Sequence, residues 1–247
     1  MKVIMFGAHN DDCEYNAGGT AALLAEKGCE VLFVNPSCII HNQSLSDEAV
    51  KEWTEMEIAA AKPLGASKII TGNRRARIFD NSRATVEELE RIILDFKPDI
   101  AFIHWPKDNH VEHRMVAKAT YKALSIASVH GAEPKEIYAF EAGITQTTNF
   151  FQPHFGIEIS SVMDKVNESL KSFSTECAQG DWLVKTKKVQ AEYRGLDLFT
   201  LGRCAEVFRI VKLPNKNEDF LIRELLKDHF RWYGRGMYPA MGEEYFE

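Results

Sequence analysis

Short apolar segments alternate with segments of helical periodicity up to residue 141, and this alternation constrains the fold more than any other feature of the sequence. The segments predicted to be strands are 2–7, 30–35, 68–71, 99–104 and 136–141. The segments predicted to be helices are 17–27, 46–64, 85–96 and 112–127. Strands and helices that alternate at this spacing form parallel strands joined by right-handed crossovers. The sequence therefore predicts an α/β fold with a Rossmann-like, doubly wound, mostly parallel sheet.

The last third of the chain is less regular, and we interpret it as a C-terminal extension of the same domain. Its patterns predict strands at 155–159 and 205–211, and helices at 162–173, 185–198 and 220–230. No internal repeat or low-complexity linker divides the chain. We expect a single domain over residues 1–247, with a core at about 1–145 and an extension at about 146–247.

Composition and charge exclude several classes of protein. Hydrophobic residues make up 45% and charged residues 27%, which is typical of globular domains. The 30 Lys and Arg against 36 Asp and Glu give a net charge of −6, which argues against a nucleic-acid or membrane-surface binder. The sequence has no signal-peptide pattern and no apolar run near the about 20 residues of a membrane span. The 5 cysteines form no Cys-x-x-Cys pair, so we expect reduced thiols and a cytoplasmic location.

Polar side chains gather in the loops after the first and fourth predicted strands. With a strand order of 3-2-1-4-5, these strands are neighbours at the point where the order reverses, where ligands of open α/β sheets bind. The loops cover residues 8–14 (AHNDDCE) and 106–114 (PKDNHVEHR). The first loop lacks the glycines of a nucleotide site, and its carboxylates repel phosphate. The two loops therefore predict a cation site.

The residue types in these loops point to a catalytic metal. His9 and Asp12 offer one nitrogen and one oxygen ligand, and His113 offers a second nitrogen. Two imidazoles and one carboxylate with an open position are typical of catalytic Zn²⁺, with another divalent metal ion as the alternative. Asp11 then remains beside the metal as a candidate general base. His110 is a candidate acid or oxyanion stabiliser, three residues before His113.

Each residue taken alone also has a structural interpretation. A histidine at a strand end often packs or caps, and two aspartates before a helix often only complement the helix dipole. Glu14 and Asp108 fit either support of the ligands or surface charge. Two such clusters in adjoining loops favour the metal site.

The two motifs resemble those of the LmbE-like, or PIG-L, family of metal-dependent de-N-acetylases. That family has Ala-His-Pro-Asp-Asp, often followed by Glu and Gly-Gly-Thr, matched here by residues 8–14 and 18–20. Its second motif, His-Pro-Asp-His, is matched by residues 110–113, and its Ala-Glu-x-Phe by residues 205–208. The resemblance covers about residues 2–212.

The resemblance implies the same division of roles. Zinc would be held by His9, Asp12 and His113, with Asp11 as general base and His110 as acid or oxyanion stabiliser. Glu112 would take the place of the acid that tunes the neighbouring histidine. Apart from the resemblance, the position of Glu14 beside the ligands leads us to expect that it supports the site.

Three departures from the family pattern concern the loops and the substrate contact. Asn10 and Val111 stand where the family has prolines. Because proline is neither a metal ligand nor a proton-transfer group, these two changes remove no such group. The arginine that family members often carry early in the second helix is missing from residues 49–54. Lys51 could replace it, as could Arg74, Arg75 or Arg77, although such a basic run is also typical of a solvated surface.

The resemblance implies a hydrolase that removes acetate from an N-acetylated amino sugar or sugar conjugate of the N-acetylglucosamine type. One alternative is a ferrous oxygenase with the same two-histidine, one-carboxylate ligand set. Another is a non-catalytic metal-binding or sugar-binding member of the family. Because Asp11 and His110 are both retained, the hydrolase is the favoured interpretation.

The last 28 residues, 220–247, are rich in large apolar side chains, which are costly to leave in water. They either fold back on their own domain or pack on a neighbouring subunit. Aromatic and methionine side chains are enriched in interface cores, and family members often assemble. We therefore predict a homo-oligomer.

Overall fold

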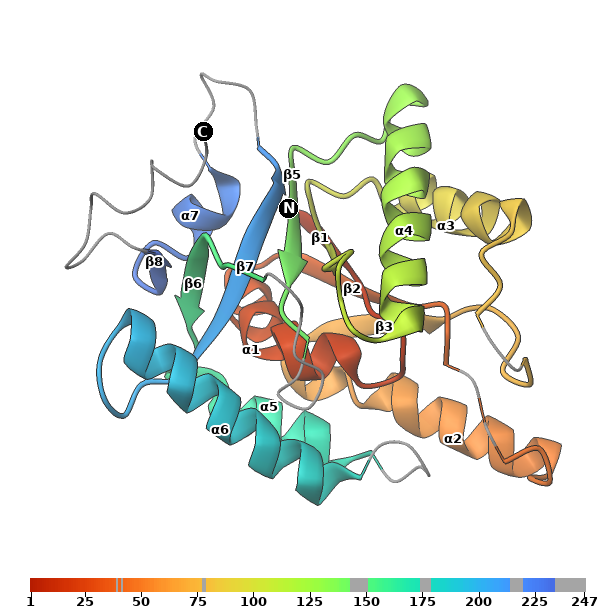
Figure 1. Ribbon diagram of the computed structural model, residues 1–247, viewed down its shortest axis with the longest axis horizontal. Coiled ribbons are helices and arrows are strands. Elements are labelled where there is room, and N and C mark those ends of the chain that lie inside the picture. Colours follow the sequence, from red (N-terminus) through yellow and green to blue (C-terminus); the bar gives the residue numbers. More distant parts are fainter. Residues whose placement is uncertain are drawn as a thin grey trace.

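The computed structural model describes residues 1–38, 40, 42–76, 79–142, 151–173, 179–213 and 220–233 (Figure 1). The strands are β1 Lys2–Phe6, β2 Glu30–Asn35, β3 Ala66–Ile70, β4 Ile100–His104, β5 Glu136–Phe140, β6 Phe155–Glu158, β7 Ala205–Lys212 and β8 Phe230–Trp232. The α-helices are α1 Asp12–Glu26, α2 Asp47–Ala59, α3 Arg83–Phe96, α4 Val111–Val129, α5 Met163–Lys171, α6 Gly180–Leu198 and α7 Leu221–Leu225. Short 3₁₀ helices cover Lys62–Leu64 and Ser160–Val162.

The described strands form one sheet in the order β3-β2-β1-β4-β5-β7-β6-β8. The first five strands pair in parallel, which confirms the predicted α/β fold and its order 3-2-1-4-5. The strands β7, β6 and β8 add to β5 in antiparallel pairs. The C-terminal part of the chain therefore extends the sheet itself. The proposed boundary at about 145 falls in 143–150, outside the described residues.

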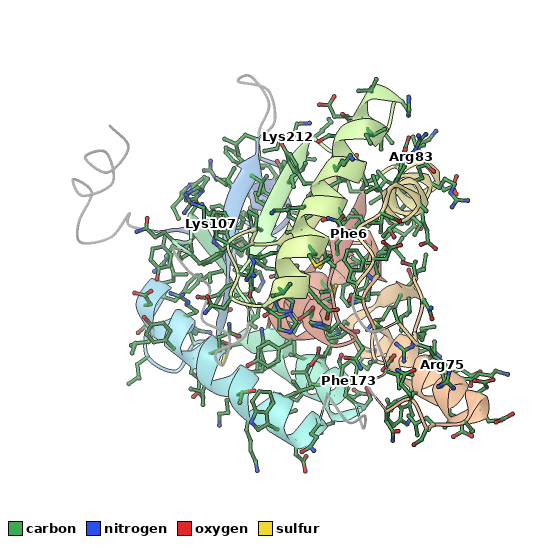
Figure 2. All side chains as sticks on the ribbon, turned by 45° about the vertical axis from the view of Figure 1, so that its right-hand side comes forward. Phe6, Arg75, Arg83, Lys107, Phe173 and Lys212 are labelled. Atoms are coloured by element: carbon green, nitrogen blue, oxygen red, sulfur yellow. The ribbon has the colours of Figure 1, made fainter. Side chains whose placement is uncertain are left out.

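Helices cover both faces of the sheet, and each face has its own apolar core. In Figure 1, α3 and α4 lie on one side of the sheet, and α1, α5 and α6 lie on the other. Successive side chains of a strand point to opposite faces, so neighbouring apolar residues enter different cores. The α1 face buries Val3, Met5, Val31, Phe33, Ile100 and Phe102. The α4 face buries Ile4, Phe6, Leu32, Val34, Ala101 and Ile103; Phe6 is labelled in Figure 2.

Several element boundaries differ from the predicted ones for identifiable reasons. The first helix begins at Asp12 rather than at residue 17, because Asp12 and Glu14 stabilise the positive end of its dipole. The second begins after Ser46, whose side chain accepts from Ala49 N as expected of an N-cap. It ends at Ala59, before a 3₁₀ turn that contains Pro63.

The prediction of one helix over 220–230 is wrong. The helix α7 covers only Leu221–Leu225, and Phe230–Trp232 form the strand β8 beside β6. The apolar spacing of such a short segment fits either structure. The free edge of β6 selects the strand, because its backbone groups form hydrogen bonds with Phe230–Trp232.

A buried carboxylate ties β7 to the middle of α1. Glu206 Oε1 accepts from Gly19 N at 3.0 Å, and Oε2 accepts from Thr20 N at 2.8 Å and from Thr20 Oγ1 at 2.7 Å. Lys187 Nζ of α6, also buried, lies 2.7 Å from Glu206 Oε1. A Cβ at Gly19 would come within 2.7 Å of the Ile159 side chain, so only glycine fits there without a shift. The Gly-Gly-Thr and Ala-Glu-x-Phe motifs therefore meet in a structural contact.

No helix among the residues described above is long and apolar enough to cross a membrane.

Candidate metal centre

The two predicted loops meet at the carboxyl edge of the sheet. One connects β1 to α1 and the other connects β4 to α4. Because β1 and β4 pair in parallel, with Met5 opposite Phe102, both loops leave the sheet at the same edge and side by side. His9, Asp12 and His113 are thereby brought into one cluster, as predicted.

The candidate ligand atoms of these three residues converge. His113 Nε2 lies 3.2 Å from His9 Nδ1 and 3.4 Å from Asp12 Oδ1. His9 Nδ1 lies 3.6 Å from Asp12 Oδ2. Ligand atoms bound tetrahedrally at about 2.0–2.1 Å from Zn²⁺ are about 3.3–3.4 Å apart. The donor types, and the distances of His113 Nε2 from His9 Nδ1 and from Asp12 Oδ1, therefore fit a zinc ion.

Two further histidines surround the cluster. The side-chain donors of His9, His110 and His113 lie within 4.8 Å of one another, as do those of Asp12, His104 and His113. The ring centroid of His110 is 4.7 Å from that of His9 and 4.6 Å from that of His113. The two groups share His113, and each contains two of the three predicted ligands. The roles of His110 and His104, the additional members, are therefore considered separately.

A carboxylate holds each candidate ligand histidine by its other ring nitrogen. Glu112 Oε2 lies 2.7 Å from His9 Nε2, and Asp108 Oδ2 lies 3.1 Å from His113 Nδ1. Such pairs fix the orientation of the ring and raise the basicity of the ligand nitrogen. Asp108 is thus a supporting residue. The side chain of Glu112 pairs with His9. To its sequence neighbour His110, Glu112 donates a hydrogen bond from its backbone N–H.

The pKa values of this pair follow from their contact. Burial alone would lower the pKa of His9, but the hydrogen bond to Glu112 and the charge of Asp12 outweigh it and raise the pKa to about 9. Burial alone would raise the pKa of Glu112, but the hydrogen bond and the charge of His9 lower it to about 2. The Glu112 carboxylate is therefore ionised in this contact at neutral pH.

Asp11 has the environment of a general base. It stands at the N-cap of α1, but its side chain makes no capping hydrogen bond. Burial, together with the neighbouring charge of Asp12, raises the pKa of Asp11 to about 7. A base acts best with a pKa near the working pH. The side chain is thus suited to accept a proton at neutral pH.

His110 stands at the N-cap of α4. Its Nδ1 accepts from Glu112 N at 3.3 Å. Burial lowers its pKa, as do the nearby rings of His9 and His113. A neutral ring whose Nδ1 accepts a hydrogen bond carries its proton on Nε2. His110 is therefore suited to donate a hydrogen bond as a neutral imidazole, rather than as a cation.

Buried polar contacts hold the first loop in place. Asn10 Nδ2 donates to Glu57 Oε1 at 2.7 Å, and Lys68 Nζ donates to the Asn10 carbonyl oxygen. Glu14 Oε1, fully buried, lies 2.8 Å from Lys68 Nζ. Glu14 therefore supports the loop through Lys68 rather than by contact with a ligand. These hydrogen bonds restrain the loop at Asn10, where the family has a proline whose ring would fix the backbone.

Of the basic residues proposed for substrate binding, Arg74 is connected to this loop. Arg74 Nη1 lies 2.7 Å from Glu57 Oε2, and Glu57 in turn accepts from Asn10. Two other nitrogens of Arg74, Nε and Nη2, are buried and have no hydrogen-bond partner among the described residues.

The other basic candidates are engaged elsewhere or fall outside the description. Arg75 Nη2 lies 2.7 Å from Asp47 Oδ1, and Figure 2 shows this side chain beside α2. Lys51 is exposed on α2 and lies 3.8 Å from Glu55. Arg77 lies outside the described residues.

Sequence reasoning missed His104, the last residue of β4. Its Nε2 lies 3.0 Å from Asp12 Oδ2, and its ring stacks on that of His113 at a centroid distance of 4.1 Å. Burial and the neighbouring His113 lower the pKa of His104 to about 4. The available signal was its position, because the carboxyl end of a central strand is where sites of this fold lie.

Comparison with known proteins places both loops in a known family. Residues 4–124 match PIG-L, described as GlcNAc-PI de-N-acetylase. The diacetylchitobiose deacetylase of Thermococcus kodakarensis is 22% identical over 192 residues, which cover 73% of this chain and 72% of that protein.

Solved structures share the fold. The N,N′-diacetylchitobiose deacetylase of Pyrococcus horikoshii superposes with a TM-score of 0.63 at 22% identity, over 87% of this chain and 88% of that one. The 4-carboxy-2-hydroxymuconate hydratase GalB of Pseudomonas putida superposes with a TM-score of 0.70 at 22% identity, over 89% and 99%. Since one fold serves both reactions, the chemistry of this chain has to be argued from its site. Both loops of the cluster lie within residues 4–124, the part of the chain that matches the PIG-L, or LmbE-like, family.

Proposed function

We propose that this protein is a zinc-dependent de-N-acetylase that removes acetate from an N-acetylated amino sugar or sugar conjugate of the N-acetylglucosamine type. One observation carries the proposal: His9 Nδ1, the Asp12 carboxylate and His113 Nε2 lie within 3.6 Å of one another. Asp11, with a pKa of about 7, stands beside them. The diacetylchitobiose deacetylase named above supports the sugar class.

The ligands proposed for zinc are His9, Asp12 and His113, oriented by Glu112 and Asp108. When bound there, zinc supplies Lewis-acid chemistry, which makes water more acidic and a carbonyl carbon more electrophilic. The remaining steps belong to side chains of this chain.

Asp11 accepts a proton from the attacking water while the water oxygen bonds to the amide carbonyl carbon. Negative charge develops on the former carbonyl oxygen, and the Nε2–H of His110 donates a hydrogen bond to it. The C–N bond then breaks, and the amine nitrogen takes the proton held by Asp11. The products are acetate and a free amino sugar.

Among the described candidates Lys51, Arg74 and Arg75, we propose Arg74 as the substrate contact, because it is linked to the loop of the site through Glu57 and Asn10. This role is tested by measuring the KM of the Arg74→Met variant for the substrate. Arg75→Met is the control, since Arg75 pairs with Asp47 on the exposed side of α2.

The deciding experiment is metal analysis of the purified protein combined with an acetate-release assay on a panel of N-acetylhexosamines and their conjugates, including N,N′-diacetylchitobiose. We expect about one zinc ion per chain and acetate release that a chelator abolishes. Bound iron with oxygen consumption would instead favour the oxygenase. Tight metal binding without hydrolysis of any member of the panel would favour a non-catalytic binding protein.

A further inference from the structure

His104 lies wholly inside the protein, against the metal cluster. Its side chain is fully buried. One face of the ring stacks on His113, with an interplanar angle of 19°. On another side, the ring of Phe140 meets it in a T-shaped contact at a centroid distance of 4.7 Å. The ring is therefore held by packing and has no access to a substrate.

The hydrogen bonds around Asp12 divide its two carboxylate oxygens. Oδ2 lies 2.8 Å from Ala8 N, 2.7 Å from His9 N and 3.0 Å from His104 Nε2. Oδ1 lies 3.4 Å from His113 Nε2, within the candidate ligand set. His9 Nδ1 lies 3.6 Å from Oδ2, but with three donors on Oδ2 the oxygen left for a metal is Oδ1.

The position of the ring proton on His104 decides whether this division holds. His104 Nε2 is also 2.9 Å from Ala8 N, so Nε2 either donates to Asp12 or accepts from Ala8. A proton on Nδ1 would be a buried donor without a partner among the described residues. The Ala8 N–H already has Asp12 Oδ2 as an acceptor at 2.8 Å. The arrangement that satisfies every donor has the proton on Nε2.

We infer that His104 is a positioning residue of the metal centre: its Nε2–H holds Asp12 Oδ2 and thereby directs Asp12 Oδ1 to the metal. The inference rests on the proposed function in one respect, namely that a metal ion is bound by Asp12. His104 itself touches neither substrate nor metal, so its effect falls first on metal affinity.

Two variants of His104 separate the hydrogen bond from the packing. His104→Gln keeps an N–H donor, and His104→Met has similar length and volume without a donor, while both lose the stacked ring. The dissociation constant for Zn²⁺ is measured by competition with a chromophoric chelator. We expect zinc binding about 10–100-fold weaker for His104→Met than for His104→Gln, the usual cost of losing a partner of a ligand. Equal zinc affinities of the two variants would overturn the inference.

The metal-free wild-type protein provides a test that needs no substitution and no turnover. Long-range ¹H–¹⁵N spectra of the histidine rings report which nitrogen of His104 is protonated. We expect the Nε2–H form, and an Nδ1–H form would overturn the inference even if neither variant folds. A wild-type protein that shows the Nε2–H form but binds no zinc would instead contradict the proposed function.

Discussion

Carboxylates hold the two candidate ligand histidines from the side that faces away from the cluster. Glu112 holds His9 and Asp108 holds His113, so each ring is fixed before a metal arrives. Asp11 is not one of these two carboxylates, and its side chain makes no capping hydrogen bond at the start of α1. The geometry thus separates the carboxylates that hold the candidate ligands from Asp11, the general base that we propose.

Replacement of Asp11 tests this separation. Asp11→Asn is expected to retain zinc, because Asp11 is not in either candidate ligand group. Its turnover should fall by about 10²–10⁴-fold, the usual cost of removing a general base. Zinc content and acetate release are measured on the same sample. Nearly full activity on the true substrate would show that another group is the base.

Replacement of His110 distinguishes a proton donor from a ligand. His110 belongs to one of the two candidate ligand groups, together with His9 and His113. We expect His110→Ala to keep zinc and to lose turnover, because the ligand set of His9, Asp12 and His113 stays complete. His113→Ala is the matched control and should lose the metal. If His110→Ala is also depleted of zinc, His110 is a ligand.

The helix α1 is fixed to the sheet from its middle as well as from its start. Glu206 of β7 accepts hydrogen bonds from the backbone of Gly19 and Thr20, while Asp12 in the first turn belongs to the candidate metal cluster. The partner of Glu206 is Lys187 of α6, equally buried. The C-terminal part of the chain therefore braces the helix that carries a candidate ligand.

Adjacent lysines on α6 allow a matched test of this brace. Lys187→Met leaves Glu206 as a buried charge without its cation, which typically costs about 3–5 kcal/mol of unfolding free energy. Lys188→Met removes an exposed pair, 3.8 Å from Glu192. That change should cost at most about 1 kcal/mol. Urea unfolding measures both variants, and equal losses would show that the Glu206–Lys187 pair contributes no special stability.

In the molecule as a whole, the candidate metal cluster joins segments that are far apart in the chain. Asp12 and His113 are separated by 101 positions, yet their side chains lie 3.4 Å apart because β1 and β4 are neighbours in the sheet. A ligand that binds only the folded protein stabilises it by mass action. Metal binding should therefore be visible in global unfolding.

Zinc is expected to raise the melting temperature of the metal-free protein. Free zinc at 100 times its dissociation constant contributes about 2.7 kcal/mol. For a chain of this size that corresponds to about 5–10 °C. Differential scanning calorimetry with zinc and then with excess chelator measures the shift, with His113→Ala as the control that should not respond. A wild-type protein whose melting temperature ignores zinc would argue against the site.

The described part of the C-terminal aromatic segment lies against its own domain. Phe230 and Trp232 pack against the core of their own chain, so this part of the aromatic segment folds back on its own domain. Met237, Tyr238, Met241, Tyr245 and Phe246 lie outside the described residues. Exposed apolar side chains instead follow one face of α6, at Trp182, Val189, Tyr193 and Leu196.

We expect a homo-oligomer that uses this face of α6. Val189→Glu should shift the protein to a smaller species in sedimentation velocity, because a charge in an apolar interface is costly to bury. Val129→Glu, at an exposed position of α4, is the control and should leave assembly unchanged. A wild-type species of 28.0 kDa at micromolar concentration would contradict the prediction.

The parallel part of the sheet and the two loops of the candidate site could be predicted from the amino-acid sequence. Strand order and right-handed crossovers follow from local periodicity, and the polar clusters stand at fixed positions directly after β1 and β4. For that reason His9, Asp12 and His113 were predictable as neighbours before any coordinates. Short segments were not: 220–230 fits a helix or a strand, and only the open edge of β6 decided between them.

The pairing of side chains around the candidate ligands depends on tertiary packing. Glu112 follows His110 closely in sequence but binds His9, and Glu14 reaches Lys68 of β3 instead of the metal cluster. The sequence likewise gave no reason to connect His104 with Asp12, 92 positions away. The periodicity of a strand or helix fixes which face of the element a side chain occupies. Its hydrogen-bond partner depends on which other element packs against that face and on which polar groups of that element are still unpaired.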